Sequence, residues 1–534
     1  MCRASHNQRS SLRLTQQCFE TGRGQPPECD SRVSSYAIGF PIERPMQSTF
    51  RRSTLAALRG FALPSGAISI VPSAADYRRC LLERIASATR RIYIIALYLQ
   101  QDEAGQEILD ALYAAKAARP ELDVVVLVDW FRAQRGLIGA GRQPGNSTWY
   151  QAQNLEYDEE VPIYGVPVQT RELFGVLHLK GSVIDDCVIY SGASINNVYL
   201  HKLDKYRLDR YHLIESAPLA DAFQNLVQRE ILPSPAVHRL DLQSPPGSRS
   251  IRSEIRAFRA DLKRAAYDTS AGEKENGELR VIPLLGVGPR NNLNRAICDL
   301  IASSKIQLTI CTPYFNLPVA VTREINRALK RGVQVDIIIG DKTANDFFID
   351  PDEPFKVISA LPYLYEISLR RFAHKHQKAI AQNRLNVHLW KHGDNTFHLK
   401  GIWVDQRYTL LTGNNLNPRA FNLDLENALL IDDPQGQWSE TREAEIAHLM
   451  RNTQRVNQYD ELDTLANYPE GVRKFLKRVS RVRVKRLLYR ILCPSSLRPT
   501  CLACRPYNQR NRVCQGRFAP NCFHIFCVIL RRLL

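Results

Sequence analysis

Two short motifs of the sequence carry the side chains that phosphoryl transfer requires. The pattern HLKGxxxD occurs at residues 178–185 and again at residues 398–405. With twelve His in the chain, only roughly 0.03 chance matches to this spacing of His, Lys and Asp are expected. Because side chains alternate along an extended strand, the His and Lys of each motif share one face, and the Leu between them points into the core. The final Asp185 or Asp405 follows an apolar stretch, which predicts a structural carboxylate buried at a strand end and paired with backbone or Lys.

The two motifs together predict one site that handles a phosphoryl group. An imidazole can attack phosphorus or carry a proton, and ammonium groups stabilise the nonbridging oxygens. A segment with Gly and short polar side chains follows each motif, and we expect it to bind the same oxygens. The predicted catalytic residues are His178, Lys180, His398 and Lys400, and the predicted phosphate-binding residues are Ser194, Asn196, Asn415 and Asn417.

Two further carboxylates are candidates to orient the histidines. A nucleophilic imidazole must be neutral and in the correct tautomer, which a carboxylate that accepts its other ring N–H achieves. Asp209 follows His178 by thirty-one residues, and Glu426 follows His398 by twenty-eight. The similar offsets favour paired catalytic roles. A surface ion pair is the alternative, above all for Asp209, which has Lys and Arg neighbours.

The same order of elements occurs twice along the chain. Residues 83–130 and residues 300–341 each have the pattern of a strand, a helix and a second strand. Pro120 and Gly332 stand where each helix is expected to stop. Such units imply parallel strands covered by helices on both faces. We therefore predict an α/β fold of two similar halves, with mixed, largely parallel sheets flanked by helices and one shared active site at their interface.

Local composition indicates where these halves begin and end. Pro, Ser, Gly and charged residues concentrate between the two copies, around a helix expected near residues 254–267. Residues 1–60 lack a sustained hydrophobic period and are predicted to be disordered. The predicted parts are an N-terminal extension (1–60), a first half (66–232), a linker with a helix (233–280), a second half (281–470), a basic amphipathic helix (471–492) and a Cys-rich basic tail (493–534).

The chain of 534 residues has a formal net charge of +18, but this charge is concentrated at its ends. Residues 471–534 hold 16 Lys and Arg and no Asp or Glu, so the body that bears the motifs is nearly neutral. A duplex-binding groove should be basic near its catalytic site, which argues against a nuclease. Four scattered Cys in the body indicate a reducing cytoplasm. We expect no signal peptide, because the first thirty residues lack an apolar h-region, and no stretch reaches the roughly eighteen apolar residues of a spanning helix.

Residues 472–492 have the pattern of a membrane-binding helix. They include nine Lys and Arg, with apolar residues at helical spacing, which is typical of an amphipathic helix that lies on an anionic bilayer. A solvated basic helix and a nucleic-acid-binding tail are the alternatives, although few aromatic residues interleave the charges. The Cys and His residues that follow are too irregularly spaced to favour a zinc site; they are Cys501, Cys504, Cys514, Cys522, His524 and Cys527.

The repeated HxKxxxxD pattern resembles the signature of the phospholipase D superfamily. Longer segments are similar to the phosphatidylserine synthases of Gram-negative bacteria, among them YSGASINNVYLH, TICTPYFNLP, GDKTANDFF and TGNNLNPRAFNLDLENALL. The resemblance covers roughly residues 66–492 and leaves both ends of the chain unmatched.

This resemblance implies a CDP-diacylglycerol:L-serine O-phosphatidyltransferase that releases CMP through a covalent phosphatidyl-histidine, with no metal and no cofactor. It implies His178 as the nucleophile and His398 as the acid/base, an assignment that the residues alone leave open. The expected partners are CDP-diacylglycerol, L-serine and an anionic membrane, with the protein in the cytoplasm and peripherally associated with the inner membrane.

Two alternatives use the same chemistry on other substrates. A phospholipase D or cardiolipin synthase-like enzyme would transfer the phosphatidyl group to water or to a glycerol-bearing acceptor, and serine-dependent CMP release separates it from a serine transferase. A phosphodiesterase acting on nucleic acid is less favoured because the body is neutral. For the serine pocket, strand-end or pre-motif positions suggest only Arg171, Asp341, Lys342 and Asn345.

Overall fold

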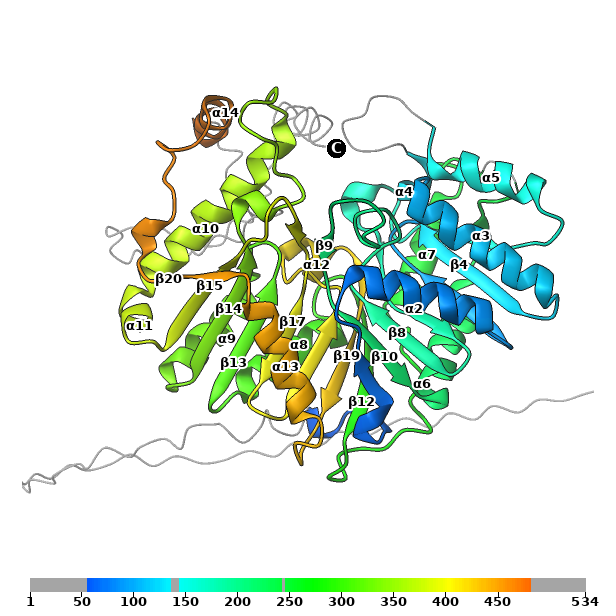
Figure 1. Ribbon diagram of the computed structural model, residues 1–534, viewed down its shortest axis with the longest axis horizontal. Coiled ribbons are helices and arrows are strands. Elements are labelled where there is room, and N and C mark those ends of the chain that lie inside the picture. The colour runs from blue at the N-terminus through cyan, green and yellow to red at the C-terminus, as the bar shows by residue number, and fades with distance from the viewer. Residues whose placement is uncertain (1–54, 136–143, 243–244, 482–534) are drawn as a thin grey trace, which may run out of the picture. The chain divides into compact units, whose positions relative to one another are not determined.

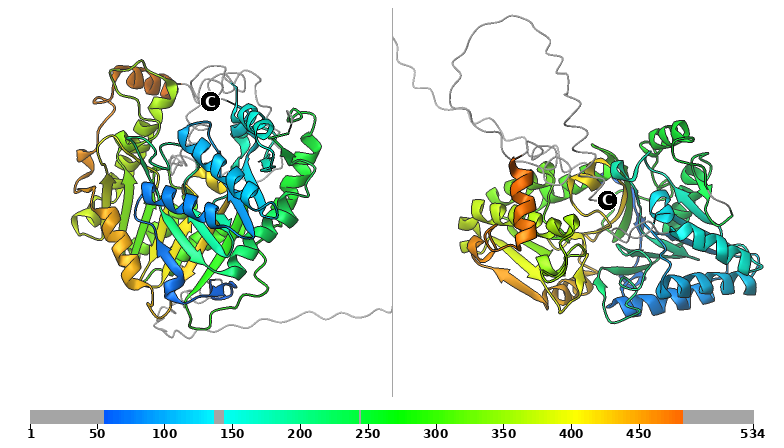
Figure 2. Two further views of the ribbon diagram at one scale, coloured as in Figure 1. Left: turned by 45° about the vertical axis from the view of Figure 1, so that its right-hand side comes forward. Right: turned by 90° about the horizontal axis from the view of Figure 1, so that it is seen from above.

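Two mixed β-sheets flanked by helices form the described part of the chain (Figures 1 and 2). The computed structural model describes residues 55–135, 144–242 and 245–481. An eight-stranded sheet is built from the first half, and a ten-stranded sheet is built mainly from the second half. This outcome confirms the predicted α/β class with two similar halves.

The elements before the second half are β1 (Phe61–Ala62), η1 (Ser65–Ala67), β2 (Ile68–Ile70), α2 (Ala74–Ser87), β3 (Arg91–Ile95), α3 (Glu103–Ala118), β4 (Asp123–Asp129), α4 (Trp130–Gln134), α5 (Asn146–Glu156), β5 (Ile163–Val166), η2 (Glu172–Phe174), β6 (Leu177–His178), β7 (Ser182–Ile184), β8 (Cys187–Ser191), β9 (Arg207–Leu208), β10 (Tyr211–Glu215), α6 (Ala217–Asn225), η3 (Leu226–Ile231), β11 (His238–Arg239) and α7 (Arg252–Leu262). The later elements are β12 (Arg280–Val287), α8 (Asn292–Ser303), β13 (Gln307–Thr312), α9 (Val319–Lys330), β14 (Gln334–Gly340), η4 (Lys342–Ala344), η5 (Val357–Ala360), α10 (Leu361–Lys375), α11 (Gln377–Ala381), β15 (Leu385–Trp390), β16 (Thr396–Phe397), β17 (Gly401–Val404), β18 (Tyr408–Thr412), α12 (Pro418–Asn422), β19 (Leu425–Asp432), α13 (Ser439–Met450), β20 (Thr453–Val456), η6 (Tyr459–Glu461) and α14 (Glu470–Arg481).

The sheets contain more antiparallel than parallel pairings. The first sheet has the order β11-β5-β4-β3-β7-β8-β10-β2, with β3, β4 and β5 mutually parallel and antiparallel pairing elsewhere among its described strands. The second sheet repeats this arrangement, with β13, β14 and β15 parallel and β6 added in parallel to β19. The expectation of largely parallel sheets is therefore wrong. Tight turns such as Asp185–Asp186, between β7 and β8, reverse the chain and pair these strands as hairpins.

The predicted repeat is confirmed at the level of single elements. The unit β3-α3-β4 corresponds to β13-α9-β14, and the strands of each unit are parallel neighbours. Helix α9 ends at Lys330, and Gly332, with a left-handed φ of 87°, turns the chain into β14. The hairpin turns after β7 and β17 also match, because Asp185 and Asp405 have φ values of 49° and 50°.

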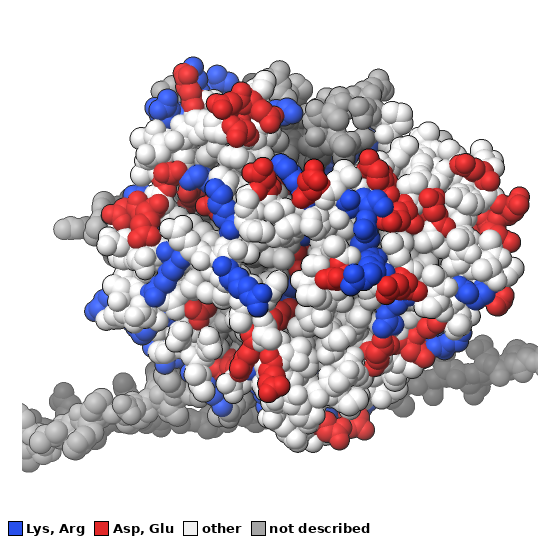
Figure 3. Space-filling view, in the orientation of Figure 1, with Lys and Arg blue, Asp and Glu red and all other residues white. Residues whose placement is uncertain are grey.

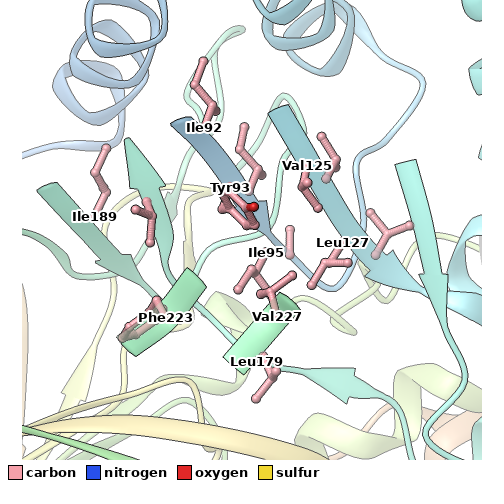
Figure 4. Packing of buried hydrophobic residues seen from close by; sticks show 14 of the residues in the cluster. Ile92, Tyr93, Ile95, Val125, Leu127, Leu179, Ile189, Phe223 and Val227 are labelled. Atoms are coloured by element: carbon pink, nitrogen blue, oxygen red, sulfur yellow. The ribbon is translucent and has the colours of Figure 1, made fainter. Parts of the chain in front are cut away.

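The core of the first half contains buried residues of its sheet, of α2 and α3, and of the helical segment that follows β10. In Figure 4, Phe223 of α6 and Val227 of η3 pack with Leu127 of β4 in one buried cluster. Leu179, between the His and Lys of the first motif, belongs to the same cluster, and Leu399 is equally buried in the second half. Burial of such a side chain contributes about 1.5–3 kcal/mol. The prediction that both Leu side chains anchor the motifs in the core is confirmed.

Two predicted boundaries differ from the structure. Residues 55–60 are not disordered, because Gly60 and Glu273 exchange backbone hydrogen bonds of 2.8 Å and β1 pairs with β12. Residues 1–54 lie outside the described residues. The first half also extends into the predicted linker, because β11 pairs with β5, and the linker helix is α7.

Helix α14 packs its apolar side against the protein. Val472 and Leu476 are buried, and Phe475 is partly buried, in a cluster that includes Tyr363 of α10. The prediction that this side faces a bilayer is therefore wrong for these three residues, because a helix with one apolar stripe buries it against the nearest apolar surface. Residues 482–492, the rest of the predicted helix, lie outside the described residues.

Candidate active site

The two motifs meet because each crosses to the other half of the protein. Strand β6, which carries His178, pairs in parallel with β19 of the second sheet and sets His178 opposite Glu426. Strand β16 pairs in parallel with β9 of the first half. The N–H of His398 then donates to the carbonyl of Leu208 at 2.9 Å, next to Asp209. Each histidine therefore stands beside a carboxylate from the other half.

His178 is buried and has one side-chain partner. Its Nδ1 lies 2.9 Å from Oε2 of Glu426, and its Nε2 makes no hydrogen bond to the described residues. Burial, followed by the positive charges of Lys180 and Lys400, lowers the pKa of His178 well below its ordinary value. Burial raises the pKa of Glu426. A neutral imidazole that donates Nδ1–H to Glu426 presents the lone pair of Nε2 to a substrate.

His398 has partners on both ring nitrogens. Its Nδ1 lies 2.9 Å from Oδ2 of Asp209 and 2.9 Å from the hydroxyl of Tyr199. The Nζ of Lys400 contacts Nδ1 and lies 3.0 Å from Nε2. Burial, then Lys400, lowers the pKa of His398 to about 4. Burial alone would raise the pKa of Asp209, but Lys400 and the hydrogen bond with His398 hold that pKa below its ordinary value.

Lys180 and Lys400 place two buried ammonium groups at this site. The Nζ of Lys180 donates to Oγ of Ser194 at 3.2 Å, and that of Lys400 lies 3.4 Å from Oδ2 of Asp209. Burial, then repulsion from Lys400, lowers the pKa of Lys180 to about 7. Burial lowers the pKa of Lys400 to about 8 in spite of Asp209. An anionic phosphate group would stabilise both ammonium groups in their charged form.

The polar segments after the motifs have matching local structures. The Oδ1 of Asn196 accepts a hydrogen bond from the N–H of Tyr199, and the Oδ1 of Asn417 accepts one from the N–H of Ala420. The NH2 groups of Asn196 and Asn417 make no hydrogen bond to the described residues, so these donors remain available. Asn415 has a buried Oδ1 without a partner among the described residues.

Asp185 and Asp405 bind backbone and not the histidines. Asp185 accepts hydrogen bonds from the N–H groups of residues 89–91, and Asp405 accepts them from residues 305–307. Both carboxylates are half-buried, which is more exposed than predicted. They tie each hairpin turn to the start of the central strand beside it, β3 or β13.

Several residues that hold the motifs in place were not predicted. Asp129, at the end of β4, accepts a 2.8 Å hydrogen bond from the N–H of Leu177. Asn427 accepts from the N–H of Lys180 and donates to its carbonyl. Tyr199 contacts His398. No motif marks these residues, because their partners lie in distant parts of the chain.

Three of the four positions suggested for serine, Asp341, Lys342 and Asn345, line one pocket, and Arg171 is not among its lining residues. Asp341 caps the short helix η4. The Nζ of Lys342 lies 2.9 Å from Oε1 of Glu366 and also forms an ion pair with Asp463. Asn345 is buried and accepts a hydrogen bond within its own loop, and Arg171 is exposed.

Within residues 55–135, 144–242 and 245–481, no group of three or more His, Cys, Asp and Glu is arranged to hold a metal ion. In this same part of the chain, no helix has both the length and the apolar character needed to cross a membrane. The Cys and His residues of the tail lie outside the described residues.

Comparison with known proteins agrees with the geometry of the site. A family model described as "Cardiolipin synthase, PLD-like domain" matches residues 297–450. CDP-diacylglycerol–serine O-phosphatidyltransferase PssA of Escherichia coli (strain K12) is 53% identical over 419 residues, which are 78% of this chain and 93% of that protein. The CDP-diacylglycerol–serine O-phosphatidyltransferase of Haemophilus influenzae is 49% identical over 436 residues, 81% of this chain and 96% of that protein. The crystal structure of phosphatidylserine synthase from Haemophilus influenzae Rd KW20 matches with a TM-score of 0.81 and 47% identity, and the match covers 83% of this chain and 99% of that chain. The chain therefore belongs to the phosphatidylserine synthase family of the phospholipase D superfamily.

Proposed function

We propose that this protein transfers the phosphatidyl group of CDP-diacylglycerol to the hydroxyl of L-serine, giving phosphatidylserine and CMP. One observation carries the chemistry: His178 has an unengaged Nε2, while His398 has proton-exchanging partners on both nitrogens. The relatives with this activity in their names match most of the described residues. In this reaction Lys180 and Lys400 supply the positive charge, so no metal or cofactor is required.

In the first step, Nε2 of His178 attacks the phosphorus that bears diacylglycerol. The lone pair forms a P–N bond, and the bond from this phosphorus to the bridging oxygen breaks, so that its electron pair leaves with CMP. Lys180 and Lys400 stabilise the nonbridging oxygens as charge builds on them. Glu426 accepts the Nδ1–H and stabilises the positive charge that the imidazole gains.

In the second step, the serine hydroxyl attacks the phosphatidyl-histidine. A P–O bond forms, the P–N bond breaks, and its electron pair returns to Nε2 of His178. The hydroxyl proton passes to His398. Burial and Lys400 lower the pKa of His398, so its imidazole is neutral before this step. Asp209 then stabilises the imidazolium.

Two rival activities predict different products. The description of the family model that matches residues 297–450 names cardiolipin synthase. A phosphatidyltransferase that uses another acceptor is therefore the second candidate. A nucleic-acid phosphodiesterase is disfavoured by charge. On the face shown in Figure 3, Lys and Arg are interspersed with Asp and Glu, whereas a nucleic-acid groove concentrates positive charge.

The test is to incubate the purified full chain with CDP-diacylglycerol, with and without L-serine, and to measure CMP and the lipid product. We expect sustained CMP release that depends on serine and an equal amount of phosphatidylserine. Phosphatidic acid formed regardless of serine would indicate a phospholipase D. A product that forms only with a glycerol-bearing acceptor would indicate a cardiolipin synthase-like enzyme.

We also propose that the protein works at an anionic membrane surface, as a peripheral protein on the cytoplasmic face of the inner membrane. Support comes from α14, where Lys474, Lys477 and Arg478 are exposed on the side opposite the packed apolar residues. The cluster that holds α14 includes Phe348, on the segment between β14 and α10. Basic residues near an anionic bilayer each add about 1 kcal/mol of attraction.

A further inference from the structure

Two oppositely charged side chains near His398 take no part in the steps above. Arg207 belongs to β9 of the first half, and Asp346 follows β14 in the second half. Their closest atoms, Nη1 of Arg207 and Oδ2 of Asp346, are 3.7 Å apart. We propose that Arg207 binds the carboxylate, and Asp346 the ammonium group, of the serine zwitterion. This inference rests on the proposed function and identifies the pocket of its second substrate.

The geometry of β9 directs Arg207 to the site. Arg207 stands in β9 two residues before Asp209, which follows the strand directly, and in extended backbone this spacing places both side chains on the same side. The Nε of Arg207 donates to Oγ1 of Thr396 at 3.0 Å, two residues before His398. The guanidinium lies 4.9 Å from the ring centre of Tyr199, whose hydroxyl contacts His398. Its two NH2 groups make no hydrogen bond to the described residues, so they remain available to a ligand.

Asp346 reaches the same place from the second half. The hydroxyl of Tyr314 donates to its Oδ1, and the ring of Tyr314 lies 6.4 Å from that of His398. The Oδ2 of Asp346 has Arg207 as its ionic neighbour, at a distance longer than a hydrogen bond. The side chains of Arg207 and Asp346 are 15% and 17% exposed. They are therefore largely withdrawn from water and still accessible to a small solute.

A free amino acid matches this pair of charges. A guanidinium binds a carboxylate through two parallel N–H···O bonds, and a carboxylate accepts hydrogen bonds from an ammonium group. Such contacts are stronger in a partly buried site than at an open surface. With both charges held, the one-carbon side chain of serine keeps its hydroxyl near His398, the proposed base. Water and glycerol carry neither charge, so the pair also selects serine over these acceptors.

A phosphate group of CDP-diacylglycerol is the main rival ligand for Arg207. Asp346 opposes this, because its carboxylate would repel a phosphate placed between the two side chains. Lys180 and Lys400 already supply the positive charge for phosphate. The remaining rival is a structural ion pair that joins the two halves and touches no substrate.

The test uses purified full-length protein with Arg207→Lys, which keeps the charge and loses the fork, and Asp346→Asn, which keeps the shape and loses the charge. We expect each variant to raise the KM for serine at least tenfold. The KM for CDP-diacylglycerol and the single-turnover release of CMP without serine should stay within about twofold of the unmodified protein, because the lost charge-assisted bond is made only to serine. A raised KM for CDP-diacylglycerol with an unchanged KM for serine would assign the pair to phosphate and overturn the proposal.

The matched control is the exposed pair Lys205 and Asp394, whose Nζ and Oδ2 lie 3.8 Å apart with side chains 65% and 86% exposed. Lys205→Met and Asp394→Asn remove charges of the same two signs, two residues before Arg207 and two residues before its partner Thr396, and they should leave every parameter unchanged. An equal effect of the two pairs on the KM for serine would show a general electrostatic effect and overturn the assignment.

Serine fragments separate binding from damage to the fold. In competition with serine, Arg207→Lys should weaken inhibition by 3-hydroxypropionate and spare that by ethanolamine, which lacks the carboxylate. Asp346→Asn should weaken inhibition by ethanolamine and spare that by 3-hydroxypropionate. Partial unfolding would weaken both inhibitors in both variants and cannot produce these opposite effects. Equal loss of both inhibitors in both variants, or no loss in either, would refute the pocket. If the unmodified protein makes no phosphatidylserine, it is the proposed function that fails.

Discussion

The carboxylate of Glu426, in the second half of the chain, lies 2.9 Å from Nδ1 of His178 in the first half. Asp209 and His398 repeat this relationship in the opposite direction, also at 2.9 Å. Each proposed catalytic histidine is thus oriented by the other half, so neither half holds a complete site. The crossed pairing leads to the first prediction.

Replacing the two carboxylates should affect different steps. Glu426→Gln should lower the rate at which the covalent intermediate forms by a factor of about 10²–10⁴, because His178 loses the acceptor that sets its tautomer. Asp209→Asn should slow transfer to serine more than formation of the intermediate. Rapid-quench measurement of CMP release and serine transfer distinguishes the two. If Asp209→Asn blocked formation of the intermediate and Glu426→Gln did not, His398, the partner of Asp209, would be the nucleophile.

Replacing the histidines should separate nucleophile from base. In His398→Ala, a burst of CMP and labelled protein should accumulate, because CMP, with a second pKa of about 6, needs little help from a proton as it leaves. His178→Ala should give neither. The measurement is acid-quenched labelling with CDP-diacylglycerol radiolabelled in its acyl chains. Label on His178→Ala and none on His398→Ala would reverse the assignment, and no label on any protein despite turnover would favour direct displacement by serine.

The pH dependence should come from the lysines. Both must be protonated to hold phosphate, so kcat/KM for CDP-diacylglycerol should fall as pH rises through about 7 and about 8, the pKa values of Lys180 and Lys400. As pH falls through 6.5, kcat/KM should not decrease, because burial keeps the pKa of His178 well below that value and the imidazole stays neutral. The two lysines repel each other, so the alkaline limb reports the pair. In Lys180→Arg, whose guanidinium stays charged, the limb should move to higher pH, and an unmoved limb would contradict its origin in Lys180.

Chelation of metal ions tests whether the two lysines supply enough positive charge for the reaction. Activity should persist in excess EDTA, because Lys180 and Lys400 already face the phosphate in the proposed mechanism. Detergent-dispersed substrate avoids effects of EDTA on vesicle aggregation. Activity that disappears and returns with Mg²⁺ or Mn²⁺ would refute a metal-free attack by histidine.

The outer side of α14 should govern attraction to membranes. The triple change Lys474→Gln, Lys477→Gln and Arg478→Gln should weaken binding to anionic vesicles at low salt, by about 1 kcal/mol per residue, and make the remaining binding less sensitive to salt. Cosedimentation measures the effect, and turnover of detergent-dispersed substrate should be retained. The control removes three exposed charges around α7, namely Arg252, Arg256 and Lys263. Equal losses for the two triples would show that net charge, and not α14, controls binding.

Local patterns in the sequence were enough to predict which residue types perform the chemistry and how the chain is arranged around them. The repeated motifs identified His178 and His398, and the repeated strand-helix-strand pattern predicted two α/β halves. Both predictions rest on spacing within one segment. The hydrophobic period and the offsets between motif residues can be recognised without knowledge of distant contacts. They also predicted that Leu179 and Leu399 would be buried, because alternation along a strand is a local property.

The partners that these residues meet depend on how distant parts of the chain pack together. Glu426 is 248 residues from His178, and Asp209 is 189 residues from His398, so no local pattern encodes the crossed pairing. An apolar stripe likewise indicates that one side of α14 is buried without saying what covers it. Arg207 faces Asp346 because the pairing of β9 with β16 brings the first half against the second half beside His398. Such contacts follow from how the sheets pack, and packing joins residues that the sequence keeps far apart.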